Sequence, residues 1–189
     1  GSGTLAVVSG SGNYDCGIDV TNLTINGGTV ISSGKIAIKS NDVIINGGTV
    51  TATGSSQGIR ADNLTIKSGN TTATGNTGVF IDNDQYNVNG SATFDWTKPT
   101  DSITIQNIVF YDDEKGSVTF TKPFILSGTN TLATADNIAG KTIVPAYKVT
   151  FNANGGNFGT DDNEQAITTV YKGAAATGTA KVTAPTPAP

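Results

Sequence analysis

The residue types that this chain of 189 residues lacks say most about its chemistry. It has no histidine and no methionine, and it has one cysteine and one tryptophan. Nucleophilic catalysis usually needs a histidine base, so we expect the lone Cys16 to be a small buried residue rather than a nucleophile. One cysteine also excludes an internal disulfide framework. Because no methionine is present, even at position 1, we expect this chain to be a fragment of a longer protein.

Charged side chains are also scarce. They make up 14% of the chain, the net charge is −4, and Arg60 is the only arginine, whereas an average soluble domain is roughly 25% charged. A nucleic-acid-binding protein normally shows a basic footprint, so we expect no nucleic-acid partner. No apolar run approaches the roughly 18 residues of a membrane span, so we expect no membrane insertion.

Glycine, threonine, asparagine and serine fill the place of the missing charges. The chain has 24 glycines. Threonine and valine favour strands, while glycine and asparagine favour tight turns. No sustained period of 3.6 residues is visible, so the composition predicts an all-β protein with many turns.

A strand-like segment recurs about every 20 to 22 residues. Its copies are residues 22–30, 42–50 and 63–71, with a looser copy at 86–93. Leu23 and Ile25 alternate with polar residues, and the next two copies keep this alternation, which is typical of a strand with one buried face. A second register has the same period and contains the pairs Gly17-Ile18, Ala37-Ile38, Gly58-Ile59 and Gly78-Val79.

This repeat predicts a parallel β-helix, in which successive turns of the chain stack about 4.8 Å apart. Equivalent apolar residues would then form internal ladders. The first predicted ladder is Ile25, Ile45, Ile66 and Val88, the second is Ile18, Ile38, Ile59 and Val79, and a third begins with Val30 and Val50. The Asn-Gly-Gly triplets at 26–28 and 46–48 are the expected bends, because glycine adopts positive φ without steric cost.

These repeats resemble those of secreted bacterial β-helix proteins. The motifs are Ile-Asn-Gly-Gly-Thr-Val at 25–30 and 45–50, and Gly-Thr-Val-Thr-Ala-Thr-Gly at 48–54. They are similar to the repeats of the carbohydrate-binding, pectin-lyase-like β-helix group, and the resemblance covers about residues 4–95. It implies a single-stranded right-handed parallel β-helix, a short solenoid, in a bacterial protein that is extracellular, either on the cell surface or secreted.

The pattern changes after the repeats. Proline interrupts it in residues 96–100, and two strand-like segments, 102–111 and 117–121, then flank a glycine-bearing loop, which predicts a hairpin. We expect residues 100–146 to continue or cap the solenoid, so that the first domain spans residues 4–146.

From Tyr147 the sequence resembles a different family. Residues 147–156, Tyr-Lys-Val-Thr-Phe-Asn-Ala-Asn-Gly-Gly, are similar to the opening of the Listeria–Bacteroides repeat, also called the internalin B-type repeat. Thr168 to Tyr171 and Pro185 also fit this family, but the Gly-Trp with which its pattern ends is missing. The resemblance implies a partial β module of a cell-wall-associated protein over residues 147–189, with a Pro/Thr/Ala linker at its end.

The residues needed for catalysis are not evident. Glycosidases use paired carboxylates at a defined separation, and lyases commonly use an arginine or lysine base near Ca²⁺. Arg60 follows the apolar Ile59, so we expect it to point outward. Residue 39 of the preceding turn is lysine, so we expect no acidic partner in register with it. The sequence therefore predicts that the chain is not an enzyme, with a polysaccharide lyase or hydrolase as a further alternative.

Asp82 and Asp84 are the candidate metal ligands. In an extended segment their side chains share one face and offer oxygen ligands to Ca²⁺. The alternative is a solvated turn, and we expect no cofactor other than Ca²⁺.

Phe80, Tyr86 and Trp96 are the candidate ligand-binding residues. They interrupt or follow the aliphatic ladders and could form an exposed platform for a polysaccharide or a host or cell-wall glycan. The alternative is that they fill a wider terminal turn of the solenoid. The sequence thus leaves two main functions open, a glycan-binding or adhesive module and a structural stalk or spacer.

Overall fold

A computed structural model describes residues 2–9, 15–83, 89–152 and 167–173, and this part of the chain is all-β apart from one short 3₁₀ helix, η1 (Asp113–Lys115). The strands are β1 (Thr4–Val8), β2 (Cys16–Asp19), β3 (Asn22–Ile25), β4 (Thr29–Lys39), β5 (Asp42–Ile45), β6 (Thr49–Ala61), β7 (Asn63–Ile66), β8 (Asn70–Thr74), β9 (Thr77–Ile81), β10 (Gly90–Phe94), β11 (Ser102–Ile105), β12 (Ile108–Phe110), β13 (Gly116–Phe120), β14 (Phe124–Leu126), β15 (Lys141–Asn152) and β16 (Ile167–Gly173). The all-β class predicted from composition is confirmed.

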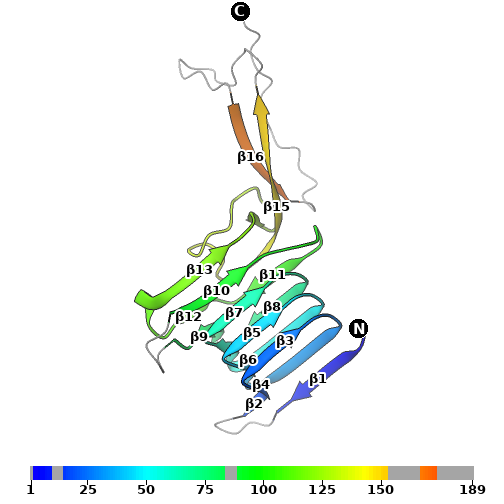
Figure 1. The fold of residues 1–189 in the computed structure, drawn as a ribbon, viewed down its shortest axis with the longest axis vertical. Helices are drawn as coiled ribbons and strands as arrows, with labels where there is room; N and C mark the ends of the chain where they lie inside the picture. The colour runs from blue at the N-terminus through cyan, green and yellow to red at the C-terminus, as the bar shows by residue number, and fades with distance from the viewer. Residues whose placement is uncertain (1, 10–14, 84–88, 153–166, 174–189) are drawn as a thin grey trace, which may run out of the picture.

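Most strands pair in parallel with the equivalent strand of the next repeat (Figure 1). β3, β5, β7, β10 and β13 form a five-stranded sheet. The second sheet contains two further rows: β1, β4, β6, β8 and β11 form one, and β2, β4, β6, β9 and β12 form the other. β4 and β6 belong to both rows because each is long, and the pairing between them shifts register between Gly34 and Ile36.

The register of these rows builds the core from equivalent residues. Ile25, Ile45 and Ile66 lie side by side on neighbouring strands, as do Val30 and Val50. The second ladder is also confirmed, with Ile18, Ile38, Ile59 and Val79 in consecutive register. Fully burying such a side chain contributes roughly 1.5–3 kcal/mol.

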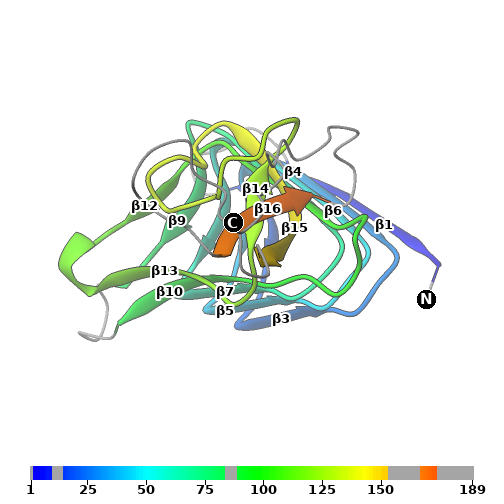
Figure 2. The same ribbon diagram turned by 90° about the horizontal axis from the view of Figure 1, so that it is seen from above.

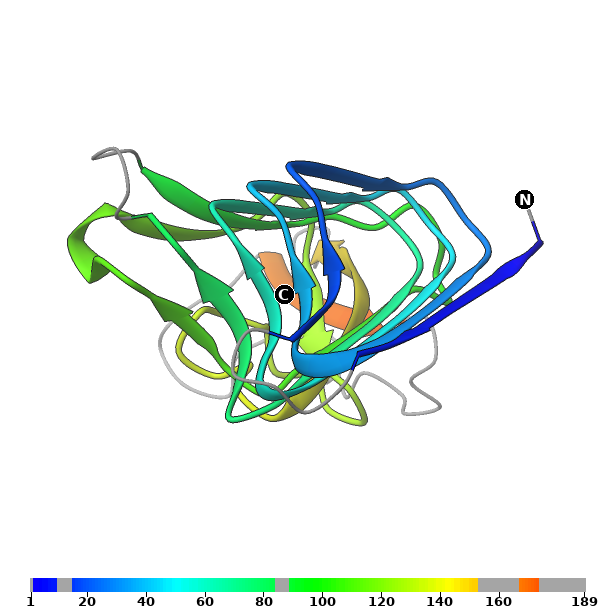
Figure 3. The ribbon, with the colours of Figure 1, turned by 90° about the horizontal axis from the view of Figure 1, so that it is seen from below.

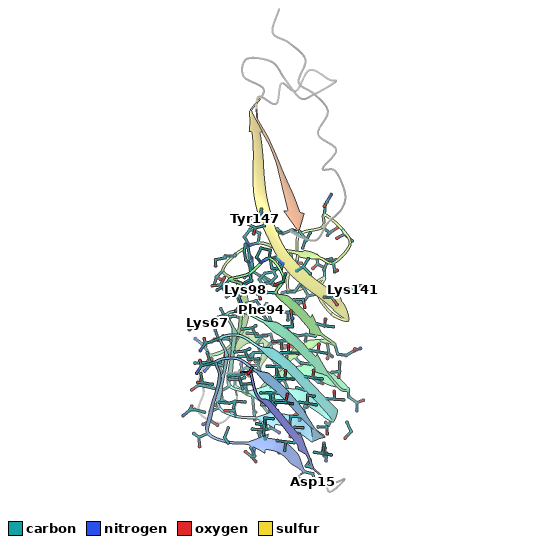
Figure 4. All side chains as sticks on the ribbon, turned by 90° about the vertical axis from the view of Figure 1, so that its right-hand side faces the viewer. Asp15, Lys67, Phe94, Lys98, Lys141 and Tyr147 are labelled. Atoms are coloured by element: carbon teal, nitrogen blue, oxygen red, sulfur yellow. The ribbon has the colours of Figure 1, made fainter. Side chains whose placement is uncertain are left out.

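The fourth member of the first ladder was predicted wrongly. Phe94, not Val88, pairs with Ile66, because β10 begins at Gly90 and not near Tyr86. The connection after β9 is therefore longer than those in the earlier repeats, and Val88 lies outside the described residues. Figure 4 shows Phe94 within the stack.

The predicted hairpin between residues 102 and 121 is also wrong. β11, β12 and β13 do not pair with one another, since each pairs in parallel with an earlier strand: β8, β9 and β10, respectively. The alternation of apolar residues in this segment fits strands equally well in either topology. Residues 102–120 continue the three rows by one more repeat.

Antiparallel strands cover the C-terminal end (Figure 2). β15 pairs with β11 and β14 through its first half and with β16 through its second half. One strand thus runs across the expected domain boundary between residues 146 and 147, and residues 153–166 and 174–189 of the expected repeat module lie outside the described chain. No helix in the described part of the chain is long and apolar enough to cross a membrane.

No described strand covers the N-terminal end in the same way (Figure 3). Ile25 is 6% exposed and Val30 is 8% exposed, whereas their neighbours Ile45 and Val50 are fully buried. Among the described strands, β1 pairs only with β4, and Leu5 and Val8 on it are exposed. In the described chain, core side chains are therefore less exposed in the middle repeats than in the first repeat.

Candidate functional site

Trp96 does not contribute to an exposed platform. Its side chain is 9% exposed, and its indole Nε1 donates a hydrogen bond to the carbonyl of Pro123 at 3.0 Å. The ring packs edge-on against Tyr147, with 5.3 Å between ring centroids, and the Lys122 ammonium lies 5.2 Å from its centroid. Figure 4 shows Tyr147 above the stack, on β15. Trp96 therefore joins the last repeat to the C-terminal strands.

Phe80 is half-buried and already has a cationic partner. It lies in register with Arg60 on the neighbouring strand, and the Arg60 guanidinium is 5.5 Å from the centroid of its ring. This cation–π contact occupies one face of the ring. Tyr86, the third predicted aromatic residue, lies outside the described residues.

Arg60 has no acidic partner in register, as expected, since its register neighbours are Lys39 and Phe80, but it has an acidic partner off register, which the sequence analysis did not find. Its Nε donates to Oδ2 of Asp82 at 2.8 Å, and its Nη2 donates to the same oxygen. Asp82 follows β9, so the partner comes from the next repeat, two residues beyond the register position of Arg60. This pairing uses the Asp82 carboxylate that was predicted to bind Ca²⁺. Asp84 lies outside the described residues, and those that are described contain no group of three or more histidine, cysteine, aspartate or glutamate side chains that could hold a metal.

A groove of about 690 Å³ lies over the row formed by β2, β4, β6 and β9. Asp19, Lys39 and Gln57 line it from three successive repeats, and Asp82 lines it from the fourth. The groove therefore runs along the direction in which the repeats stack. Its volume falls within the range of about 300–1,000 Å³ that is typical of small-molecule sites.

Ion pairs between repeats organise the charges of this groove. Lys39 contacts Asp19 at 3.4 Å, and both side chains are about half exposed. Lys39 also lies in register with Arg60, which pairs with Asp82 on its other side. Two like charges side by side are unfavourable, and the flanking aspartates offset this repulsion. Exposed pairs of this kind contribute only about 0–1 kcal/mol to folding, so their main effect is to position the charges.

The Asp62 carboxylate and the side-chain oxygen of Gln57 accept no hydrogen bond from the residues that the structure describes. The backbone N–H of Asp62 donates a hydrogen bond to the carbonyl of Asn41 at 2.8 Å, which fixes the position of this residue. Burial raises the pKa of the Asp62 carboxyl, and the negative charges of Asp82 and Asp42 raise it further, against the opposing effect of Arg60. The side-chain Oε1 of Gln57 is buried and accepts no hydrogen bond from the described part of the chain.

Cys16 lies at one end of the same groove and is half-buried rather than buried. Burial and the nearby Asp19 raise the pKa of its thiol. A raised pKa keeps the thiol protonated at neutral pH, which is the opposite of what a nucleophile requires.

The sequence contained a signal for this groove that the repeat analysis did not use. The column one residue after the second ladder contains Asp19, Lys39, Arg60 and Phe80, and structural register brings these residues side by side. The partner of Arg60 is offset by two residues from this column, so reading across the columns alone could not find it. Comparison with protein-family models, curated proteins and solved structures gave no significant match to this chain.

Proposed function

We propose that this chain is a non-catalytic glycan-binding module of an extracellular bacterial surface protein, built as a right-handed parallel β-helix. The parallel rows, the repeat of about 20 residues and the aliphatic ladders support the β-helix. The resemblance of residues 25–54 to secreted carbohydrate-binding β-helix repeats supports the location and the class of ligand.

The groove across four repeats is the observation that carries the proposal. Its walls offer carboxylates, two lysines, an arginine and side-chain amides within one elongated hollow. Sugar hydroxyl groups both donate and accept hydrogen bonds, so a glycan chain can pair with this mixture along its length. The proposed binding site is therefore the polar face of β2, β4 and β6, and not the aromatic residues that the sequence favoured.

A spacer is the second candidate, and the burial of Trp96 favours it. The Trp96 ring packs in the core and is therefore not available to a ligand. A module that only holds other domains apart needs no more than a continuous core and a polar surface. The spacer interpretation predicts that the groove has no ligand.

A hydrolase is the third candidate, and the positions of Asp62 and Asp82 favour it. These residues follow Ala61 and Ile81, which are paired in register, so two carboxyl groups lie on successive repeats in one groove. Glycosidases use such pairs. The Arg60 contact to Asp82 and the lack of histidine argue for binding without cleavage.

A glycan array tests the proposal, run with the whole chain and with Ser56→Tyr, which places a bulky ring in the groove. Ser117→Tyr on β13 is the matched control, because Ser117 is exposed and does not line the groove. We expect binding to weaken by about tenfold or more in the first variant, or about 1.4 kcal/mol. The control should bind as the parent chain does.

The other outcomes separate the candidates. No bound glycan from a correctly folded protein would favour the spacer. Release of reducing ends from a bound glycan over time would identify a hydrolase.

A further inference from the structure

Most charged groups of the groove are already paired within the molecule. Lys39 and Arg60 contact Asp19 and Asp82, and Lys35 also interacts within the chain. The Asp62 carboxylate is different, since no side chain in the described ranges donates a hydrogen bond to it. Asp62 is partly exposed and lines the groove, so its carboxylate is free to accept hydrogen bonds from a bound group.

The charges around Asp62 also indicate which charge a bound ligand group should carry. Asp82 lines the same groove, and Asp42 lies close enough to act on Asp62 electrostatically. The positive charge of Arg60 has the opposite effect and lowers the pKa of Asp62. Its guanidinium, however, contacts both Asp82 and the ring of Phe80. Two aspartates and one arginine thus act on Asp62, and the arginine is already paired with Asp82, so a bound cation would be favoured next to Asp62 over a carboxylate.

We propose that this part of the groove binds a protonated primary amine of the glycan, so that the preferred ligands are amino sugars with a free amino group. An ammonium group has three donors and no acceptor, which suits the Asp62 carboxylate. The hydroxyl groups of the same sugar would meet the neighbouring amide and hydroxyl side chains, such as those of Asn41 and Ser56. This inference rests on the proposed glycan-binding function and names its substrate class.

The test compares three trisaccharides by isothermal titration calorimetry at low salt: a β-1,4-linked glucosamine oligomer, its N-acetylated form and a galacturonate oligomer. Trilysine is included because it carries ammonium groups without sugar hydroxyls. Asp62→Asn removes the charge while it keeps the shape of the side chain. Asp113→Asn is the control, because it removes the same charge from an exposed position of η1, outside the groove.

We expect the glucosamine oligomer to bind about tenfold more tightly than its N-acetylated form, a difference of about 1.4 kcal/mol. Asp62→Asn should abolish this preference, and Asp113→Asn should keep it. The preference should also fade as the pH falls and Asp62 becomes protonated, since its raised pKa places that loss above the range of an ordinary aspartate.

Equal binding of the amino and N-acetylated oligomers would overturn the amine inference and leave glycan binding intact. A preference that survives Asp62→Asn would overturn the role of Asp62. Tighter binding of trilysine than of the glucosamine oligomer would show that the amine partner is a peptide and not a sugar. Failure of every saccharide to bind would overturn the proposed function together with the inference.

Discussion

Single glycines set how closely successive repeats stack. Gly48 has φ of +91° and Gly69 has φ of +94°, a region that residues with a side chain rarely adopt. Each faces the backbone of the preceding repeat, so a Cβ atom on Gly48 would lie 2.4 Å from the carbonyl oxygen of Gly28. These bends therefore need glycine both for their backbone conformation and for the close approach of the chains.

We predict that Gly48→Ala destabilises the protein by about 2 kcal/mol or more, because strain at positive φ adds to a clash with backbone that has little room to move. Gly47→Ala is the control, since its Cβ would be 3.6 Å from its nearest contact, the carbonyl oxygen of Asn26. Urea denaturation followed by circular dichroism measures both changes. Equal losses from the two substitutions would contradict the assigned role of Gly48.

At the scale of the strand, stability depends on the position of a residue within its ladder. Ile45 is fully buried between Ile25 and Ile66, whereas Ile25 is 6% exposed and has a ladder neighbour on one side only. The same residue type in the same repeat position therefore has two different environments.

We predict that Ile45→Ala costs about 2–5 kcal/mol of unfolding free energy, the range for truncation of a buried isoleucine. Ile25→Ala should cost less, because the open N-terminal end lets water or a small shift fill the space. Parallel urea titrations of the two variants give the comparison. A larger loss from Ile25→Ala would mean that the first repeat is covered in solution.

The strands also show where sequence reasoning succeeded and where it failed. Residues 22–66 repeat with almost constant spacing, so the register of Ile25, Ile45 and Ile66 could be predicted. After Ile81 the connection lengthens, and the local pattern of residues 86–93 suggested Val88 where Phe94 lies. A period can be extrapolated only while the connections keep their length, since one extra loop changes which residue reaches the core.

At the scale of the whole molecule, the two ends of the described chain differ. The C-terminal end is covered by β14 and the first half of β15, and Trp96 joins this cover to the last repeat. The N-terminal end presents β1 and β3, each paired on one side only. An open edge offers unpaired backbone groups, and stacked repeats separate most easily where a neighbour is missing.

We predict that native-state hydrogen exchange is fastest at the amides of β1 and β3 and slowest at those of β6 and β7, which have partners on both sides. Local opening at the end needs few contacts to break, whereas opening of the middle approaches global unfolding. Exchange followed by mass spectrometry on peptic fragments measures this gradient. Uniform protection from β1 to β7 would show that the repeats open only as one unit.

The sequence by itself determined the all-β class, the stacking period and the residues of the first ladders. These follow from local alternation and from the spacing of glycine bends, which the first three repeats carry in their own residues. Only the tertiary structure decided that residues 102–120 pair with earlier strands, that Trp96 is buried, and that Arg60 meets Asp82. These contacts join residues from different repeats, and their formation depends on connection lengths and side-chain reach that no single repeat encodes.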